Sequence, residues 1–258
     1  MAFRIIVLGS GTIIPSMERR ATSLLVEAGG EQVLFDCGPG TLEALEENGI
    51  SFRSLRTIFF THYHPDHSLG LAHLLAALNV DPAASIEHII TVYGPVGLRE
   101  LVVRLQACYR SMIPKRHFLE LIEIGEGAVP RDGAAAISAA AASHGDAAAL
   151  AYRVDFEGAS IVFTGDTSLS DSLVQFSNGA DYLFAECSFP DSCPAAGHLT
   201  PSAVGRLAVA AGVGRVILVH MYPLFDGEDP IAGVKRQYGG PVDIAYDSME
   251  FDVETKRP

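Results

Sequence analysis

Residues 61–67 read Thr-His-Tyr-His-Pro-Asp-His, a stretch that carries three histidines and one aspartate. Imidazole and carboxylate side chains are ligands that zinc and its first-row neighbours take in proteins. Desolvating four such groups together would be costly unless a cation held them in place. A polar surface loop would not explain the H-x-H-x-D-H spacing of His62, His64, Asp66 and His67. The stretch therefore predicts a metal site.

The segments on either side of the motif have regular periodicity. Residues 55–60 predict a strand that ends where the motif begins. Leucines recur at helical spacing from Leu71 to Leu78, which predicts an amphipathic helix over residues 68–78. The motif is thus expected in the turn between a buried strand and a helix.

The N-terminal part of the chain predicts a hairpin followed by a helix. Gly29-Gly30 separates two strand-like runs, and Gly38-Pro39-Gly40 leads into a helical run. In that helix Thr41 is expected to be the N-cap and Gly49 the stop. The predicted elements are strands over residues 4–8, 22–28 and 32–35 and a helix over residues 41–48.

The rest of the chain repeats this alternation. Its predicted strands cover residues 89–93, 152–156, 160–163, 182–185, 215–219 and 244–246, and its predicted helices cover residues 96–109 and 201–211. The alanine-rich residues 133–143 fit either a helix or a weak strand. Two halves with mixed sheets and outer helices predict an α/β fold (α+β in some schemes), built as a four-layer αββα sandwich in one domain, residues 1–258.

Composition and charge narrow the possible partners. Hydrophobic residues make up 48% of the chain and charged residues 19%, as in a globular protein. No apolar run approaches the ~20 residues of a membrane span, and residues 5–8 resemble a short strand rather than a signal peptide. A cytoplasmic protein without membrane contact is therefore expected. The four cysteines form no C-x-x-C pair and are expected to be reduced thiols. The net charge of −13 argues against extended nucleic-acid binding but is compatible with a small anionic substrate held by metals.

The motif alone does not complete a catalytic metal site. A single tetrahedral ion cannot take four motif ligands and keep an open position for chemistry. Further ligands are therefore expected where other strands end. His144 follows the ambiguous segment 133–143, Asp166 follows the strand over residues 160–163, and His220 follows the strand over residues 215–219.

With these residues the chain resembles the metallo-β-lactamase superfamily, and within it the ribonuclease Z-like branch. The resemblance runs from Leu8-Gly9-Ser10-Gly11 through Phe35-Asp36-Cys37-Gly38 and residues 61–67 to Val219-His220. It implies the αββα fold and two divalent ions, zinc in the first place with manganese or iron as alternatives. It also implies that residues 133–143 form a strand ending at His144.

The resemblance also implies a role for each candidate ligand. One metal would be bound by His62, His64 and His144, the second by Asp66, His67 and His220, and Asp166 would bridge both. Two ions ~3.5–4 Å apart would clamp both oxygens of an in-line displacement and lower the pKa of a shared water toward ~7. Asp66, which lies close to that water in this family, is expected to orient it or take its proton.

A leaving group needs a proton of its own. His198, in Gly197-His198-Leu199-Thr200, resembles an H-x-T histidine that ribonuclease Z-like enzymes pair with a glutamate similar to Glu186. A carboxylate partner favours the imidazolium form, which a general acid requires. The alternative is a loop histidine that caps the following helix.

The resemblance is less specific for substrate. True tRNA-processing ribonucleases of this family carry a long Gly/Pro-rich arm, which in bacterial forms lies between the residues matching His144 and Asp166. Here that interval is 166 − 144 = 22 positions, which is too short, and with the acidic charge it argues against tRNA 3′ processing. A small basic cluster could serve as an arm elsewhere or be a solvated helix face: Arg104, Arg110, Lys115 and Arg116.

The leading hypothesis is a dinuclear hydrolase of a small or cyclic phosphodiester. Arg19 and Arg20 follow the first Gly-rich loop and could reach a substrate phosphate, with plain surface charge as the alternative. The same metal pair would also suit ester, thioester or sulfate-ester hydrolysis. An iron-dependent oxygenase of sulfur compounds or a diiron electron-transfer protein is a further class, which Glu186 and His198 disfavour. Relatives often form dimers, so a homodimer is expected.

Overall fold

The computed structural model describes residues 3–84, 88–225 and 227–256. In this part of the chain the strands form two mixed seven-stranded sheets. The first sheet has the order β14-β1-β2-β3-β4-β5-β6. Its strands are β1 (Phe3–Gly9), β2 (Ser23–Ala28), β3 (Glu31–Phe35), β4 (Thr57–Phe59), β5 (His88–Gly94), β6 (His117–Glu123) and β14 (Met249–Asp252).

The second sheet is built from the later part of the chain and has the order β13-β12-β11-β10-β9-β8-β7. Its strands are β7 (Gly127–Ala128), β8 (Ala136–His144), β9 (Ala147–Phe156), β10 (Ala159–Phe163), β11 (Tyr182–Glu186), β12 (Arg215–Val219) and β13 (Val242–Ile244). The pairs β10–β11, β11–β12 and β12–β13 are parallel, whereas β7–β8, β8–β9 and β9–β10 are antiparallel.

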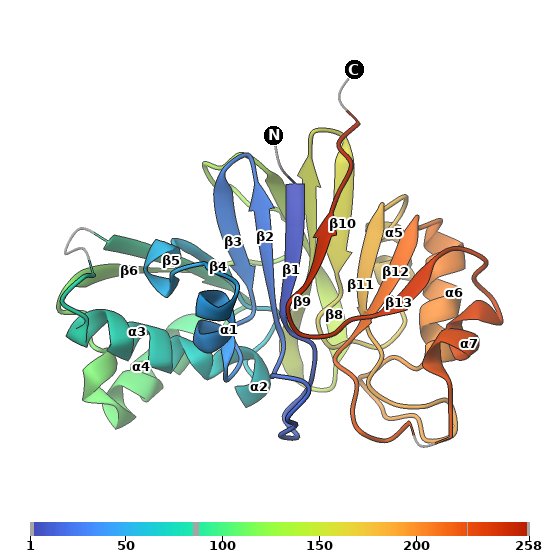
Figure 1. Cartoon of the computed structure of the whole chain (residues 1–258), viewed down its shortest axis with the longest axis horizontal. Helices are drawn as coiled ribbons and strands as arrows, with labels where there is room; N and C mark the ends of the chain where they lie inside the picture. The colour runs from blue at the N-terminus through green and yellow to red at the C-terminus, as the bar shows by residue number, and fades with distance from the viewer. Residues whose placement is uncertain (1–2, 85–87, 226, 257–258) are drawn as a thin grey trace.

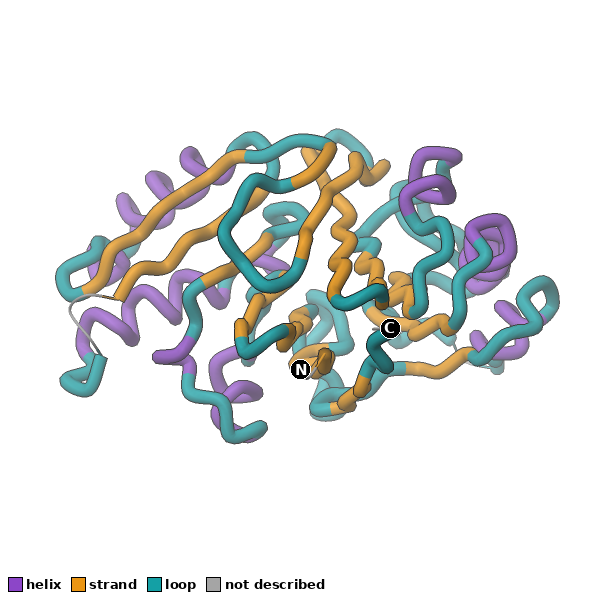
Figure 2. Tube along the Cα trace, turned by 90° about the horizontal axis from the view of Figure 1, so that it is seen from above, coloured by secondary structure: helices purple, strands orange, loops and turns teal. Residues whose placement is uncertain are grey.

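Helices cover the outer face of each sheet, as Figures 1 and 2 show. On the first sheet lie α1 (Thr41–Glu47), α3 (Gly70–Val80) and α4 (Leu98–Cys108), and on the second α5 (Asp171–Phe176), α6 (Pro201–Ala211) and α7 (Pro230–Lys235). A single turn, α2 (Pro65–Ser68), begins within the motif, and 3₁₀ helices cover Phe52–Ser54 and Arg110–Met112. The predicted four-layer αββα order is confirmed.

The two sheets meet through interlocking aromatic rings. Phe35 and Phe59 of the first sheet lie 5.5 and 5.2 Å from Tyr152 of the second, measured between ring centroids. Tyr152 is fully buried, and its hydroxyl donates to the carbonyl oxygen of Phe60 at 2.7 Å. Phe60 immediately precedes the motif, so this hydrogen bond fixes the start of the motif to the opposite sheet.

The ambiguous alanine-rich segment is a strand. β8 pairs antiparallel with β9 from Ala136, opposite Asp155, to His144, opposite Ala147. Pairing from Ala136 onward overrides the helix propensity of alanine, which is a weak preference, whereas residues 133–135 precede the strand. The strand prediction that came from the family resemblance is therefore confirmed.

Several local predictions differ from the structure, among them the strand predicted over residues 152–156, which is β9 and begins at Ala147. The N-cap of α1 is Gly40 at φ 90°, whereas Thr41 donates its hydroxyl to the carbonyl oxygen of Gly38. The helix predicted over residues 68–78 begins at Gly70 and is preceded by the separate turn α2. The strand predicted over residues 244–246 is β13, two residues earlier, because the parallel pairing with β12 uses Val242–Ile244.

The helices are short. The longest, α3, α4 and α6, have 11 residues each. Within the described residues, no helix combines the length and the apolar character that crossing a bilayer would require.

Candidate metal centre

The candidate ligands all follow strand ends. The motif follows β4, His144 is the last residue of β8, Asp166 lies three residues beyond β10, and His220 directly follows β12. In the second sheet β8, β10 and β12 run in the same direction, so their carboxyl ends lie at one edge. The structure thus brings all the predicted ligands together where the two sheets meet the motif.

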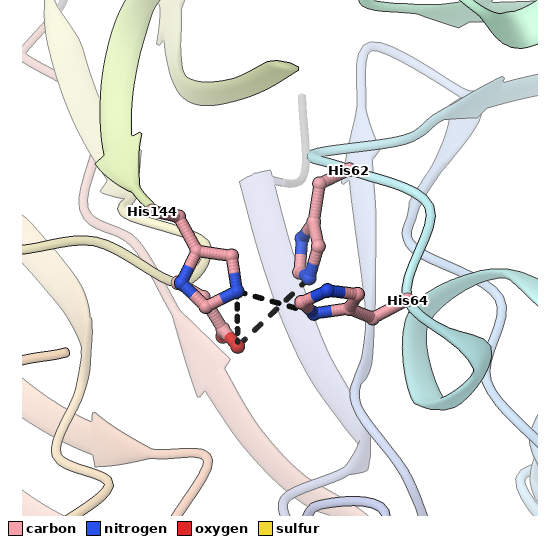
Figure 3. A group of neighbouring side chains, drawn as sticks. His62, His64 and His144 are labelled. Atoms are coloured by element: carbon pink, nitrogen blue, oxygen red, sulfur yellow. Dashed lines mark hydrogen bonds and ion pairs between the residues drawn. The ribbon is translucent and has the colours of Figure 1, made fainter. Parts of the chain in front are cut away.

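A first group consists of His62, His64, His144 and Asp166, whose ligand atoms all lie within 4.8 Å of one another. Figure 3 shows the three imidazoles pointing toward one another. His144 Nε2 lies 3.1 Å from His64 Nδ1 and 3.8 Å from Asp166 Oδ2, and His62 Nε2 lies 3.9 Å from the same oxygen. This is the first ligand set that the resemblance implied, with Asp166 beside it.

A second group consists of Asp66, His67 and His220, also within 4.8 Å. His220 Nε2 lies 3.3 Å from Asp66 Oδ2 and 3.2 Å from His67 Nε2. Asp166 faces this group with its other oxygen, because Oδ1 lies 3.5 Å from His67 Nε2. The Asp166 carboxylate therefore lies between the two groups, with one oxygen toward each.

Hydrogen bonds from outside the two groups determine which ring nitrogens carry protons. The fully buried carboxylate of Asp36 accepts from the Thr61 amide and hydroxyl, both at 2.8 Å. Having donated its one proton, the Thr61 hydroxyl accepts from His62 Nδ1 at 3.0 Å. Asp36 also accepts from His67 Nδ1 at 2.7 Å. With protons on Nδ1, His62 and His67 present Nε2 lone pairs to the two groups, as metal-binding histidines do.

The arrangement fits a divalent cation. His144 donates from Nδ1 to the carbonyl oxygen of Gly197 at 2.8 Å, which leaves its Nε2 lone pair facing His64. His62 Nε2 and Asp166 Oδ1 are buried and have no hydrogen-bond partner in the described structure. An unpaired buried polar atom costs about 1–3 kcal/mol, which coordination of a cation would offset. Imidazole nitrogens and carboxylate oxygens suit zinc, manganese or iron.

At His67 and Asp66, burial and the neighbouring charges shift the side-chain pKa in opposite directions. Burial and the neighbouring histidines lower the pKa of His62, which keeps it neutral. Burial also lowers the pKa of His67, but the carboxylates of Asp166 and Asp36 outweigh it and raise this pKa to about 9. Burial raises the pKa of Asp66, but its contact with His220 and the nearby imidazoles of His67 and His220 outweigh burial and lower this pKa to about 2. A metal ion and a proton would compete for the Nε2 lone pair of His67.

His198 and Glu186 form a pair beside these groups. His198 Nδ1 lies 3.0 Å from Glu186 Oε1, and Glu186 is 1% exposed. Burial lowers the pKa of His198, but the hydrogen bond and charge of Glu186 outweigh it, so this pKa is raised. The N-cap of α6 is Thr200, not His198. The structure therefore favours the pairing with Glu186 over the helix-capping alternative.

The two candidate substrate arginines are both hydrogen-bonded within the protein, and Arg19 also lines a cavity next to the site. Arg20 donates to both carboxylate oxygens of Glu47 at 2.7 Å. Arg19 donates to the Ser10 hydroxyl at 2.9 Å and to the carbonyl oxygen of Ala245 at 2.7 Å. These contacts hold the first loop in place, and a role in substrate binding stays a prediction.

Sequence reasoning assigned no role to Asp36 and Thr61, although both orient ligands. Asp36 has φ 58°, a left-handed conformation that is uncommon for a residue other than glycine. The signal was present, since a single acidic residue follows the apolar end of β3 and precedes Cys37-Gly38. Such strained, buried polar residues cluster at functional sites.

Comparison with known proteins identifies the family. Residues 31–221 match the family model described as β-lactamase superfamily domain. The chain is 31% identical to Ribonuclease Z of Bradyrhizobium sp. (strain ORS 278), over 89% of this chain and 93% of the relative. It belongs to the metallo-β-lactamase superfamily, in its ribonuclease Z-like branch. Another member, Ribonuclease Z of Mycobacterium marinum, is 30% identical over 98% of this chain and 99% of the relative.

Solved structures of superfamily members share the fold. The metallo-β-lactamase fold protein YhfI from Bacillus subtilis has a TM-score of 0.85 at 24% identity and covers 98% of this chain and 100% of its own. Human tRNase Z, short form, has a TM-score of 0.77 at 24% identity, covering 97% and 99%. A diphosphatase from the PhnP family has a TM-score of 0.76 at 20% identity, covering 99% and 98%. The chain is thus a metallo-β-lactamase-fold hydrolase whose His/Asp groups imply a divalent metal.

Proposed function

We propose that this protein is a dinuclear metal-dependent phosphodiesterase that hydrolyses a small or cyclic phosphodiester. The observation that carries the proposal is the position of Asp166 between two ligand groups, with the His198–Glu186 pair alongside. His62, His64 and His144 would hold one ion, Asp66, His67 and His220 the other, and Asp166 both. Zinc is the expected metal. When bound, such ions activate a water molecule at neutral pH and offset the charge of a phosphate.

The remaining steps fall to side chains of the protein. Asp66, whose low pKa keeps it ionised, would accept a hydrogen bond or a proton from the attacking water. Since Nδ1 of His198 is bound to Glu186, its Nε2 is the atom that would protonate the leaving oxygen. Glu186 keeps the ring oriented and favours the protonated state between turnovers.

A cavity beside the site has a size that suits a small substrate. It has a volume of about 430 Å³, within the range of small-molecule pockets. Its wall includes Tyr222, whose ring centroid lies 5.8 Å from that of His220 and 6.4 Å from that of His198. Ile14, Pro15 and other residues of the first loop form the facing wall. Tyr222 thus places the cavity next to His220 and His198, although the residues that line it include none of the candidate ligands.

Three observations disfavour long RNA as the substrate. His144 is joined to β9 by Gly145-Asp146, and β9 to β10 by Glu157-Gly158, so the interval before Asp166 holds only tight turns and strands. The alignment with the Bradyrhizobium ribonuclease Z spans 287 positions, more than the 258 residues here, so that relative contains segments without a counterpart. The net charge is −13. Each disfavours a long tRNA bound along the protein surface and is compatible with a small anionic substrate.

A substrate panel tests the proposal. Zinc-loaded protein would be assayed on bis(p-nitrophenyl) phosphate, a cyclic nucleotide, a thioester, a sulfate ester and a precursor tRNA. We expect the highest kcat/KM on a small phosphodiester, loss of that activity after dialysis against chelator, and its return with zinc. The variant Asp166→Asn, checked by circular dichroism for retained fold, would exclude a contaminating hydrolase.

Other outcomes separate the alternatives. A preference for the thioester or sulfate ester would overturn the phosphodiester assignment while leaving the metal site intact. Cleavage of precursor tRNA at a kcat/KM above that for every small diester would reinstate the ribonuclease alternative. Activity that depends on iron and oxygen would point to the oxygenase class.

A further inference from the structure

Ser188 lies two residues beyond Glu186 and connects the two halves of the site. It is fully buried, and its hydroxyl oxygen lies 2.9 Å from His220 Nδ1 and 3.0 Å from the His220 carbonyl oxygen. The same hydroxyl is hydrogen-bonded to Glu186 Oε2, and the Ser188 amide also donates to that oxygen at 3.2 Å. One side chain therefore contacts a candidate metal ligand and the partner of the candidate general acid.

Counting protons determines the direction of these hydrogen bonds. The Ser188 hydroxyl has one proton, and both the Glu186 carboxylate and the His220 carbonyl oxygen can only accept it. His220 Nδ1 must then donate to the hydroxyl oxygen rather than receive from it. The proton on Nδ1 leaves the lone pair of His220 on Nε2, which faces Asp66 and His67. Ser188 thus selects the imidazole tautomer that binds metal in the second group.

The backbone conformation of His220 is also unusual and is held by hydrogen bonds to neighbouring residues. Its φ is 52°, in the left-handed region that residues other than glycine seldom adopt. Its amide donates to the carbonyl oxygen of Ser10 at 3.0 Å, and Ser188 contacts both its ring and its carbonyl. The conformation that points the ring into the second group is therefore held by partners on two other loops.

We propose that Ser188 is a positioning residue that couples the Glu186–His198 pair to the second metal group through His220. This inference rests on the proposed function only in that Asp66, His67 and His220 hold a metal. It adds that the affinity for this ion depends on Glu186, although Glu186 is not among the grouped ligands. The candidate general acid and the second ligand group are then parts of one hydrogen-bonded network.

Metal affinity tests the proposal without a substrate. Zinc-loaded protein would be titrated with a chromophoric chelator, which resolves the release of each ion. Removing a hydrogen-bond partner of a metal-binding histidine lowers metal affinity about 10–100-fold. We therefore expect Ser188→Ala to lower the affinity for one of the two zinc ions by this factor. The affinity for the other zinc ion should stay unchanged. Ser188→Thr keeps the hydroxyl and should restore the affinity.

A matched control separates this effect from general damage to the fold. Ser177 at the end of α5 is also fully buried, but its hydroxyl has no hydrogen-bond partner in the described structure. Ser177→Ala should release both ions as the unsubstituted protein does. Equal weakening of both ions in Ser188→Ala, or a failure of Ser188→Thr to restore the lost affinity, would overturn the positioning role.

A double-mutant cycle tests the coupling itself. Glu186→Gln should lower the affinity for the same zinc ion several-fold. The glutamine side chain has one acceptor oxygen, whereas the Glu186 carboxylate accepts from Ser188 with one oxygen and from Thr167 with the other. In a Ser188→Ala background the same substitution should have a much smaller effect on metal affinity, because the Ser188 hydroxyl joins Glu186 to His220 directly. If the loss of metal affinity in the double variant equalled the product of the losses in the two single variants, the two residues would act independently and the coupling would be refuted. Protein that shows the coupling but hydrolyses no phosphodiester would instead refute the proposed function alone.

Discussion

At the scale of single residues, the site depends on side chains that are not themselves candidate ligands. Asp36 accepts three hydrogen bonds, from the Thr61 amide, the Thr61 hydroxyl and His67. These bonds fix the tautomers of two candidate ligands at once. The H-x-H-x-D-H spacing identified the ligands, but it contains no information about the groups that orient them. Asp36 follows β3, far from the motif in sequence, and Thr61, although next to His62, is not one of the spaced residues.

Asp36→Asn should weaken metal binding while preserving the backbone. Asparagine tolerates the left-handed conformation at this position, so the fold should survive. Its amide nitrogen cannot accept the His67 proton as a carboxylate oxygen does, so we expect a loss of zinc affinity of about 10–100-fold. Chelator titration measures it, with Asp155→Asn as a control at a half-exposed carboxylate on β9. Unchanged affinity in Asp36→Asn would refute the orienting role.

His198→Ala should retain both metal ions and lose turnover selectively. A general acid matters most when the leaving oxygen is a poor leaving group, and its removal typically costs 10²–10⁴-fold in rate. We expect a loss in that range for an alkyl phosphodiester and a small change for a p-nitrophenyl diester. Metal analysis and steady-state kinetics on the two substrates provide the comparison. Equal losses on both would contradict the role as an acid.

At the scale of elements, local patterns predicted most strands but not their partners. Residues 133–143 could not be assigned from sequence, because alanine favours helix and only the pairing with β9 makes them a strand. The helices α5 and α7 have six residues each, too short to give a clear 3.6-residue periodicity. β14 was missed because its four residues join β1, which is more than 240 positions away. Long-range pairing of this kind leaves little local signal.

The start of α3, after the break from α2, requires glycine at position 70. A Cβ atom there would lie 2.6 Å from the carbonyl oxygens of Cys37 and Gly38, and the Gly70 amide donates to the former at 2.8 Å. Gly70→Ala should therefore separate the start of α3 from the loop that contains Asp36 and cost about 1–3 kcal/mol of unfolding free energy. Urea denaturation measures this cost. Gly125→Ala, where a Cβ meets nothing within 4 Å, should be neutral.

At the scale of the whole molecule, the metal ligands come from both sheets. His62 and His64 follow β4 of the first sheet, whereas His144 ends β8 and His220 follows β12 of the second. The aromatic contacts between the sheets lie next to the same motif, through the Tyr152 hydroxyl and the carbonyl oxygen of Phe60. A cation bound to ligands from both sheets would therefore hold the two halves of the sandwich together.

Metal removal should accordingly lower the stability of the entire fold rather than of one loop. A ligand that binds only the folded chain stabilises it by about 2.7 kcal/mol at a free concentration 100 times its Kd. For a chain of this size about 2–4 °C of Tm corresponds to each kcal/mol, so zinc at that concentration should raise the Tm by several degrees over chelated protein. Differential scanning calorimetry measures this shift and reports whether unfolding remains a single transition. Asp166→Asn, which alters the carboxylate between both groups, should show a smaller zinc-dependent shift. If zinc raised the Tm of Asp166→Asn as much as that of the unsubstituted protein, the ion would bind elsewhere.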